Sequence, residues 1–256
     1  MSHAISDTLV LAKRNLIRIV RAPDLLTAFT IQPVMFVLLF VYVFGGAIQV
    51  PQYFDSYADF LIPGIVVQNI AFGGFATALG LSADLQLGLI DRFRSLPMAR
   101  SAVLAGRTVA DIATNLLSLT IVTGVGLLVG FAFDAPLGNI LLGLLLMIML
   151  GYAFSWVFAY IGMVSSTPEA ANAIGFMTIF PLTFISSAFV PVESMPAALQ
   201  AFAEANPFTT MVDAMRHLWQ SAPANTDVWV AFLETIVITV VFFFISTATY
   251  RRATAK

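Results

Sequence analysis

Ionisable side chains within the apolar stretches of this chain are the first candidates for chemistry. Arg107, Asp111 and Glu234 are such residues, in a chain whose charged fraction is only 10%. If the stretches cross a membrane, a carboxyl group there could relay protons or bind a cation, because charges in lipid are costly and usually functional. Structural roles explain them more simply. Arg107 and Asp111, four residues apart, predict an ion pair on one helix, and Glu234 can be a snorkelling or hydrogen-bonded carboxyl.

Residues for enzyme chemistry are scarce. The chain has no cysteine, and its two histidines, His3 and His217, lie outside the apolar stretches, which argues against a thiol nucleophile or a histidine-bound metal. It also has only two lysines and no G-x-x-x-x-G-K-[ST] motif, so it cannot cradle nucleotide phosphates in a loop of that type. We therefore predict no catalytic residues, no metal and no cofactor on this chain, and any ATP that drives it must be hydrolysed by a separate protein.

The composition is that of a membrane protein. Hydrophobic residues make up 59% of the 256 positions and include 23 phenylalanines, and the mean hydropathy is +0.92. A soluble domain of this length could not bury so much apolar surface. The net charge of -2 and the scattered basic residues argue against a nucleic-acid partner. We predict an all-α polytopic membrane protein that forms one transmembrane domain over residues 1–256.

Six apolar runs are long enough to cross a hydrocarbon layer, which takes about 20 helical residues. They cover approximately residues 24–46, 60–83, 103–131, 138–163, 171–190 and 228–250. Pro33 and Pro181 fall inside runs one and five, where a membrane bundle can absorb a kink. The sequence therefore predicts six transmembrane helices.

Basic residues predict the orientation of these helices. If the spans alternate in direction, eleven of the twelve lysines and arginines lie on one side of the membrane, and only Arg216 lies on the other. The side rich in lysine and arginine is normally the cytoplasmic one. We therefore expect a multi-pass protein of the cell membrane with both termini in the cytoplasm.

Two segments on the cytoplasmic side are candidates for contact with another protein. Residues 5–22 form an amphipathic pattern whose basic face includes Arg14 and Arg18, and they predict an interfacial helix that either anchors the chain or docks a partner. Residues 84–98 predict a short amphipathic helix that ends near Pro97. Its charged core reads Asp91, Arg92, Phe93 and Arg94. This segment is either a solvated loop or a surface that a soluble partner grips.

The outer stretch 191–220 predicts a helical hairpin. Ser194 could cap a first helix, and the pair Asn206-Pro207 interrupts it. The second helix then carries an apolar face with helical spacing. That face consists of Phe208, Met211, Val212, Met215, Leu218 and Trp219. Two amphipathic helices too short to span suggest a hairpin that re-enters the outer leaflet, either packed against the spans or acting as a lid.

Whole segments of the chain resemble the permease subunits of type 2 ABC exporters, particularly the daunorubicin-resistance-type branch. The similar segments are KRNLIRIVRAPDLL, IQPVMFVLLFVYVFGGAI, GLIDRFRSLPMARSAVLAGR and MPAALQAFAEANPFTTMVDAMRHLWQ. They occur in the same order and extend over essentially the whole chain. One departure is Asp91, where the family often has glutamate. The likeness implies an exporter of a lipophilic or amphipathic substrate such as a drug, lipid or glycolipid, in a bacterium.

The resemblance also implies partners and roles. In such permeases the N-terminal helix and the helix between spans two and three contact a cytoplasmic ATPase, present in two copies, which binds the ATP and Mg²⁺. This assigns coupling to Asp91, Arg92, Phe93, Arg94, Arg14 and Arg18. Two permease chains, identical or sister, commonly pair through spans one and five around the substrate path. The outer hairpin, with Pro207, Phe208, Met211, Met215 and Trp219, would cap that path.

Polar residues inside the spans mark the candidate path. The candidates are Gln32, Gln68, Asn69, Thr178 and, as an aromatic neighbour, Phe184. Uncharged polar groups in membrane helices more often form interhelical hydrogen bonds than substrate contacts, and both roles stay open. The alternative function is a self-sufficient protein without an ATPase partner, either an ion-coupled transporter or an intramembrane enzyme.

Overall fold

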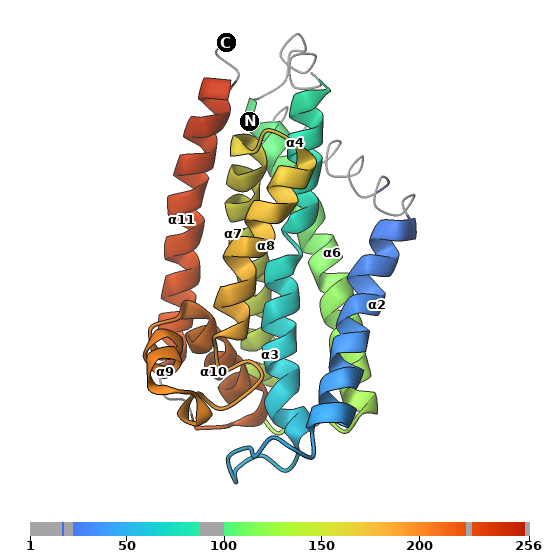
Figure 1. The fold of residues 1–256 in the computed structure, drawn as a ribbon, viewed down its shortest axis with the longest axis vertical. Helices are drawn as coiled ribbons and strands as arrows, with labels where there is room; N and C mark the ends of the chain where they lie inside the picture. Colours follow the sequence, from blue (N-terminus) through green and yellow to red (C-terminus); the bar gives the residue numbers. More distant parts are fainter. Residues whose placement is uncertain (1–16, 18–22, 88–99, 224–226, 254–256) are drawn as a thin grey trace.

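The computed structural model describes residue 17 and residues 23–87, 100–223 and 227–253 as a bundle of helices, with no strand in these ranges (Figure 1). The helices of the bundle are α2 (Pro23–Leu39), α3 (Tyr57–Phe72), α4 (Phe75–Gln86), α6 (Arg100–Leu128), α7 (Leu137–Val164), α8 (Pro168–Phe184) and α11 (Val228–Ala253). A π-helical turn, η1 (Phe40–Phe44), extends α2. A short 3-10 turn, η2 (Val192–Ser194), and the helices α9 (Ala197–Glu204) and α10 (Pro207–Gln220) lie between α8 and α11.

Helical segments occupy all six predicted runs. Within the described residues, four helical stretches are long and apolar enough to cross a membrane: Tyr57–Gln86, Gly106–Leu128, Leu137–Val164 and Val228–Tyr250. The first and fifth runs are shorter, with an apolar helix at Ile31–Phe44 and 17 residues in α8. The part of the chain that the structure describes is therefore helical, with spans suited to a membrane.

Two helices differ from the predicted boundaries. The second run is divided at Gly73 and Gly74, between α3 and α4. The fifth helix ends at Phe184 rather than near residue 190. Pro181 lies within its last turn and has no backbone N–H to donate, and the Ser186 hydroxyl then donates to the carbonyl of Thr183 at 2.6 Å, which favours a turn over further helix. Hydrophobicity continues past this point, so it could not reveal where the helix stops.

Helix α7 is the centre of the bundle and packs against α4, α6 and α11. Close approach depends on glycine at one crossing, because a Cβ atom on Gly162 would lie 2.5 Å from the backbone oxygen of Ala78 on α4. Helix α11 covers α7 from one side and exposes Trp229, Leu233 and Phe244 on its outer face. An apolar outer face of this kind suits contact with lipid.

The segment predicted as an outer hairpin contains η2, α9 and α10, which lie at the end of the bundle opposite to the end where α4 and α11 finish (Figure 1). The predicted apolar face of α10 is buried throughout: Phe208, Met211, Val212, Met215, Leu218 and Trp219. Asn206 caps α10 by accepting from the N–H of Phe208, and Pro207 begins the helix. Ser194 does not cap α9; its hydroxyl donates to the carbonyl of Pro191 in the preceding turn.

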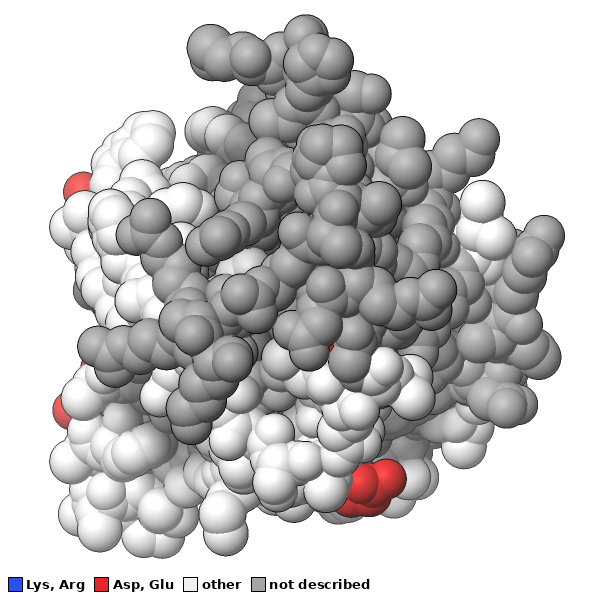
Figure 2. All heavy atoms as spheres, turned by 90° about the horizontal axis from the view of Figure 1, so that it is seen from above, with Lys and Arg blue, Asp and Glu red and all other residues white. Residues whose placement is uncertain are grey.

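The end where α4 and α11 finish is the predicted cytoplasmic end. Its described surface is mostly uncharged, with a few acidic side chains toward the edge (Figure 2). The predicted coupling residues Asp91, Arg92, Phe93, Arg94, Arg14 and Arg18 lie outside the described residues. Their assignment therefore rests on the sequence alone.

Arg107 pairs with a different carboxylate from the one predicted. Its Nη2 atom lies 3.4 Å from Oδ2 of Asp84 on α4, and both side chains are buried. The guanidinium passes over Gly80, where a Cβ atom would lie only 2.2 Å from Nη2. Asp111 instead accepts a hydrogen bond from the Thr77 hydroxyl. Because Gly80 leaves a gap, the guanidinium reaches α4 and pairs with Asp84, while its charge still acts on Asp111 in the next turn of α6.

Replacing Gly162 with alanine is expected to destabilise the crossing of α4 and α7. The added methyl group would collide with the backbone of Ala78, and overpacking of this kind costs about 1–3 kcal/mol. The matched control is Gly124→Ala on α6, where a Cβ atom would meet nothing within 4 Å. Thermal unfolding in detergent should show a lower midpoint for Gly162→Ala and an equal or higher midpoint for Gly124→Ala. Equal midpoints for the two variants would contradict the role of this contact.

Candidate substrate pocket

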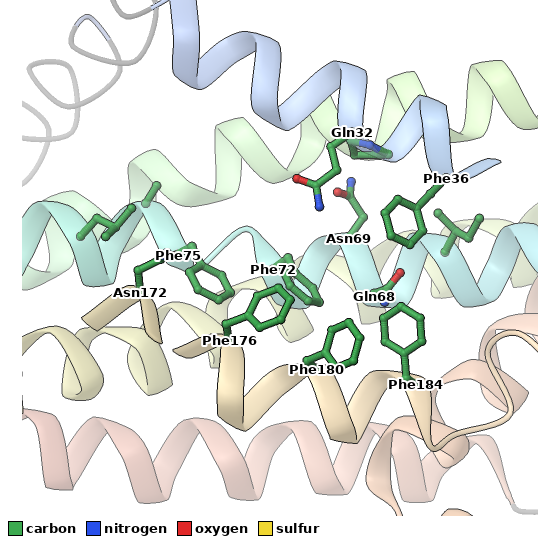
Figure 3. Close-up of a pocket in the computed structure, with 14 residues that line it drawn as sticks. Gln32, Phe36, Gln68, Asn69, Phe72, Phe75, Asn172, Phe176, Phe180 and Phe184 are labelled. Atoms are coloured by element: carbon green, nitrogen blue, oxygen red, sulfur yellow. The ribbon is translucent and has the colours of Figure 1, made fainter. Parts of the chain in front are cut away.

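A pocket of about 300 Å³ lies between α2, α3, α4 and α8. Gln32 and Phe36 reach it from α2, and α8 forms the opposite wall, with α3 and α4 between them (Figure 3). Six phenylalanines and four carboxamides dominate the lining: Phe36, Phe72, Phe75, Phe176, Phe180, Phe184, Gln32, Gln68, Asn69 and Asn172. This size and this mixture of apolar wall and few polar groups are typical of a small-molecule site.

Helical spacing explains why these side chains meet. The wall formed by α8 uses residues 172, 176, 180 and 184, and residues four apart lie on one face of a helix. Gln32 and Phe36 of α2 have the same spacing. The face formed by α3 continues across the break at Gly73 into α4, so that Phe72 and Phe75 both line the pocket.

The phenylalanines form a continuous chain of ring contacts, which we call the aromatic chain. It joins Phe158, Phe75, Phe72, Phe176, Phe180, Phe184, Phe189 and Phe40 in this order, with successive ring centroids 4.2 to 6.2 Å apart. Stacked or edge-on rings at such separations attract one another beyond simple burial. The aromatic chain runs from Phe158 in the centre of the bundle to Phe189 in the turn after α8 and ends at Phe40 of η1. A flat apolar ligand could stack on an exposed ring, where it would take the place of a neighbouring ring.

Two of the carboxamides also join helices. Gln68 Nε2 donates to Oγ1 of Thr183 on α8 at 3.3 Å, and Asn69 Nδ2 donates to Oγ of Ser118 on α6 at 2.6 Å. The interhelical hydrogen bonds that the sequence left open are thus present. Both residues still line the pocket, and an amide can accept through its oxygen while its nitrogen donates.

Four of the five predicted path residues converge in this pocket: Gln32, Gln68, Asn69 and Phe184. Thr178 does not, because it lies two residues from both Phe176 and Phe180 and therefore on another face of α8, where its hydroxyl donates to the carbonyl of Ile174. Sequence reasoning missed Phe176 and Phe180. Their signal was available, since Phe176, Phe180 and Phe184 recur every four residues.

A buried arginine lies near the end of α8 that carries Phe184. Arg216 of α10 donates from Nη2 to the carbonyl of Ser187 at 2.7 Å and from Nε to the carbonyl of Phe60 at 2.9 Å. Its guanidinium also pairs with Asp213 at 3.2 Å. Burial lowers the pKa of Arg216 to about 10, although Asp213 opposes this shift, so the side chain stays charged at neutral pH. Burial likewise raises the pKa of Asp213 against the opposing effect of Arg216.

The other ionisable candidates lie outside the pocket. Asp111 is held by Thr77 at the contact between α4 and α6, and Glu234 of α11 lies near Thr210 of α10 with one buried carboxyl oxygen that has no hydrogen-bond partner in the described part of the chain. The described residues contain no group of three or more histidine, aspartate or glutamate side chains placed to hold a metal ion. The pocket can therefore bind by stacking and by hydrogen bonds to amides.

Comparison with known proteins matches this architecture to one family. The ABC-2 type transporter family matches residues 6–219. The daunorubicin resistance ABC transporter permease protein DrrB1 of Streptomyces coeruleorubidus is 32% identical over 98% of this chain and 88% of its own length. The probable doxorubicin resistance permease protein DrrC of Mycobacterium tuberculosis is 24% identical over 97% of this chain and 90% of its own.

A more distant relative is a putative transport permease, ycf38, of Cyanophora paradoxa, which is 24% identical over 84% of this chain and 74% of its own length. These matches extend across the helices that build the pocket, and those to DrrB1 and DrrC cover almost the whole chain. The chain therefore belongs to the ABC-2 type transporter family and is a permease of its daunorubicin-resistance branch, as the resemblance in the sequence predicted.

Proposed function

We propose that this permease exports a lipophilic or amphipathic compound through the pocket between α2 and α8, driven by two copies of a separate ABC ATPase that binds ATP and Mg²⁺. The observation that carries the proposal is the lining of the pocket, in which phenylalanine rings alternate with carboxamides. Rings accept flat apolar groups, and amides accept the hydroxyl or carbonyl groups that such compounds carry. A drug is the substrate class we favour, because two relatives are named for resistance to daunorubicin and doxorubicin.

A second permease chain would complete this site. Phe176 and Phe180 line the pocket while 46% and 39% of their surface is exposed. The neighbouring surface of α2 exposes Ile31 and Met35. In the family, permeases commonly pair through spans one and five, which are α2 and α8 in this chain. We propose that a second copy packs on this face and encloses the pocket between the two chains.

The proposal includes the predicted topology. Six membrane crossings, with α2 and α8 as the short ones, place the ends of α4 and α11 in the cytoplasm and the hairpin of α9 and α10 in the outer leaflet. Short helices can span if flanking residues snorkel or the bilayer thins locally. The arginine-rich segment between α4 and α6 then faces the cytoplasm, where an ATPase can grip Asp91, Arg92, Phe93 and Arg94.

The ion pair at the inner end supports such coupling. Asp84 lies in the last turn of α4 and Arg107 in the second turn of α6, so the pair joins the two helices that flank the proposed coupling segment. A force that the ATPase applies to that segment would act on α4 and α6 together. The alternative of an ion-coupled transporter gains no support from the pocket, because Asp111 and Glu234 do not line it.

Reversing the charges of the proposed coupling segment should uncouple the permease from its ATPase. In the variant Asp91→Lys with Arg94→Glu, we expect about tenfold weaker association with the ATPase, equivalent to ~1.4 kcal/mol, because like charges would face each other at the contact. Co-purification and substrate-stimulated ATP hydrolysis in proteoliposomes measure the two consequences. Arg100→Glu, at the end of the same segment, is the control. If association and stimulated hydrolysis match wild type in the double variant, the segment is not the ATPase contact.

Removing one ring from the α8 wall should weaken substrate binding. Phe180→Leu keeps an apolar side chain but loses stacking worth about 1 kcal/mol, so the Kd for a flat aromatic compound should rise about fivefold. Equilibrium binding of daunorubicin to purified permease in lipid nanodiscs, followed by its fluorescence, measures this change. Phe244→Leu is the matched control, because Phe244 lies on the exposed face of α11. An unchanged Kd in Phe180→Leu would place the binding site elsewhere.

A further inference from the structure

The polar face of α10 contacts the chain where α8 ends. Four polar residues, Asn206, Thr209, Asp213 and Arg216, follow one another at spacings of three and four and therefore form a stripe along one side of the helix. We call it the polar stripe. The polar stripe lies beside the buried apolar face of α10. The sequence pattern alone assigns no function to the stripe.

Every member of the polar stripe bonds to residues 182–188. Asn206 Nδ2 donates to the carbonyls of Leu182 and Ile185, both at 2.7 Å. The Thr209 hydroxyl accepts from the N–H of Ser187 at 3.3 Å, and Asp213 accepts from the Ser187 hydroxyl at 2.8 Å. Arg216 donates to the carbonyl of Ser187 at 2.7 Å. The stripe thus supplies the partners that the last turn of α8 and the following turn need.

Arg216 extends these contacts to α3. Its Nε donates to the carbonyl of Phe60, and its guanidinium lies over the Phe60 ring with 3.6 Å between Cζ and the ring centroid. Only 5% of Arg216 is exposed. A single side chain of the hairpin therefore joins α3 to the turn that follows α8.

The held segment adjoins the pocket through Phe184, the one residue of 182–188 that lines it. Thr183, which accepts from Gln68, and Phe184, which lines the pocket, lie directly before the residues that Arg216 and Asp213 hold. Across this contact, Gly64 of α3 approaches so closely that a Cβ atom would lie 2.4 Å from the oxygen of Ala188. The position of the hairpin and the width of the pocket at its outer end are therefore set by the same contacts.

We propose that Arg216 is a positioning residue through which the outer hairpin keeps the outer end of the pocket closed, so that the hairpin and the end of α8 move together when the pocket opens outward. Movement of the hairpin is then transmitted through the end of α8 to the pocket wall. Substrate release requires the contacts of Arg216 to α3, to the turn after α8, or to both, to separate. Because packed contacts of this kind have discrete arrangements, the two positions should exchange as a unit.

The absence of cysteine from the chain provides a direct test. Ile65 lines the pocket from α3 and is only 1% exposed, so Ile65→Cys introduces a single thiol at the closed site. A membrane-impermeant maleimide is applied from the hairpin side to the full-length permease in proteoliposomes. In the Arg216→Met background, labelling should be at least about tenfold faster than with Arg216 present, as an opening equilibrium shifted by ~1.4 kcal/mol requires. Arg216→Lys, which keeps the charge but loses the fork of donors, should give an intermediate rate.

Two controls separate positioning from a general loss of stability. His217→Ala changes the neighbouring residue, whose Nδ1 lies 2.8 Å from the carbonyl oxygen of Ala222 just after α10. Ser246→Ala removes a buried hydrogen bond from α11 to the carbonyl of Trp156 on α7, and neither of these residues lines the pocket. Both should label at the wild-type rate. Should Arg216→Met not fold, Thr209→Val removes one bond of the stripe and should still accelerate labelling severalfold. Rates in the Arg216 and Thr209 variants within twofold of wild type, or equal acceleration in Ser246→Ala, would overturn the proposal.

Discussion

A helix that ends inside an apolar bundle leaves backbone carbonyls without water to bond, and α8 ends in this way at Phe184. Side chains of α10 meet the requirement: Asn206 donates to two of the carbonyls and Arg216 to another beyond them. The charge on Arg216 is in turn balanced by Asp213 and by the face of the Phe60 ring. Satisfying the end of one helix thus fixes the position of a second helix and brings a third into contact.

The same early end shapes the pocket. Because α8 stops at Phe184, the chain turns back and places Phe189 against both Phe184 and Phe40, with ring centroids 4.8 and 4.6 Å apart. The aromatic chain therefore crosses from α8 to the π-helical turn η1 that continues α2. Aromatic contacts join α8 to η1 at one end of the pocket, and amide hydrogen bonds join α3 to α8 and to α6 in its middle. The shape of the pocket therefore depends on several helices together.

Local sequence patterns predicted the helices and their buried faces. The apolar runs coincide with the helices of the bundle, and the spacing of Phe208, Met211 and Met215 identified the buried side of α10. The polar residues inside apolar runs pointed to Gln32, Gln68 and Asn69, which the fold brings together in one pocket. These signals succeed because hydrophobicity and period determine which side of a helix is buried.

Choices between partners could not be predicted in this way. Arg107 was assigned to Asp111 on its own helix, but the gap over Gly80 directs it to Asp84 on another helix. The end of α8 could not be predicted because apolar residues continue beyond it. The break at Gly73 and Gly74 has the same sequence pattern as glycines that allow close helix packing. Arg216 was counted only as the basic residue on the outer side. In each case the outcome depends on tertiary neighbours that the periodicity of a single helix does not specify.

The pair of Arg107 and Asp84 has a consequence for how the bundle can deform. Separating two buried charges strands each of them in apolar surroundings, so intermediate separations are the most costly. The inner ends of α4 and α6 therefore have two favourable states, joined or fully parted with both charges solvated, and no gradual path between them. A small displacement of these helix ends therefore leaves the ion pair joined, and a displacement large enough to break it separates the ends fully. The two helix ends thus switch between two positions and do not move apart gradually.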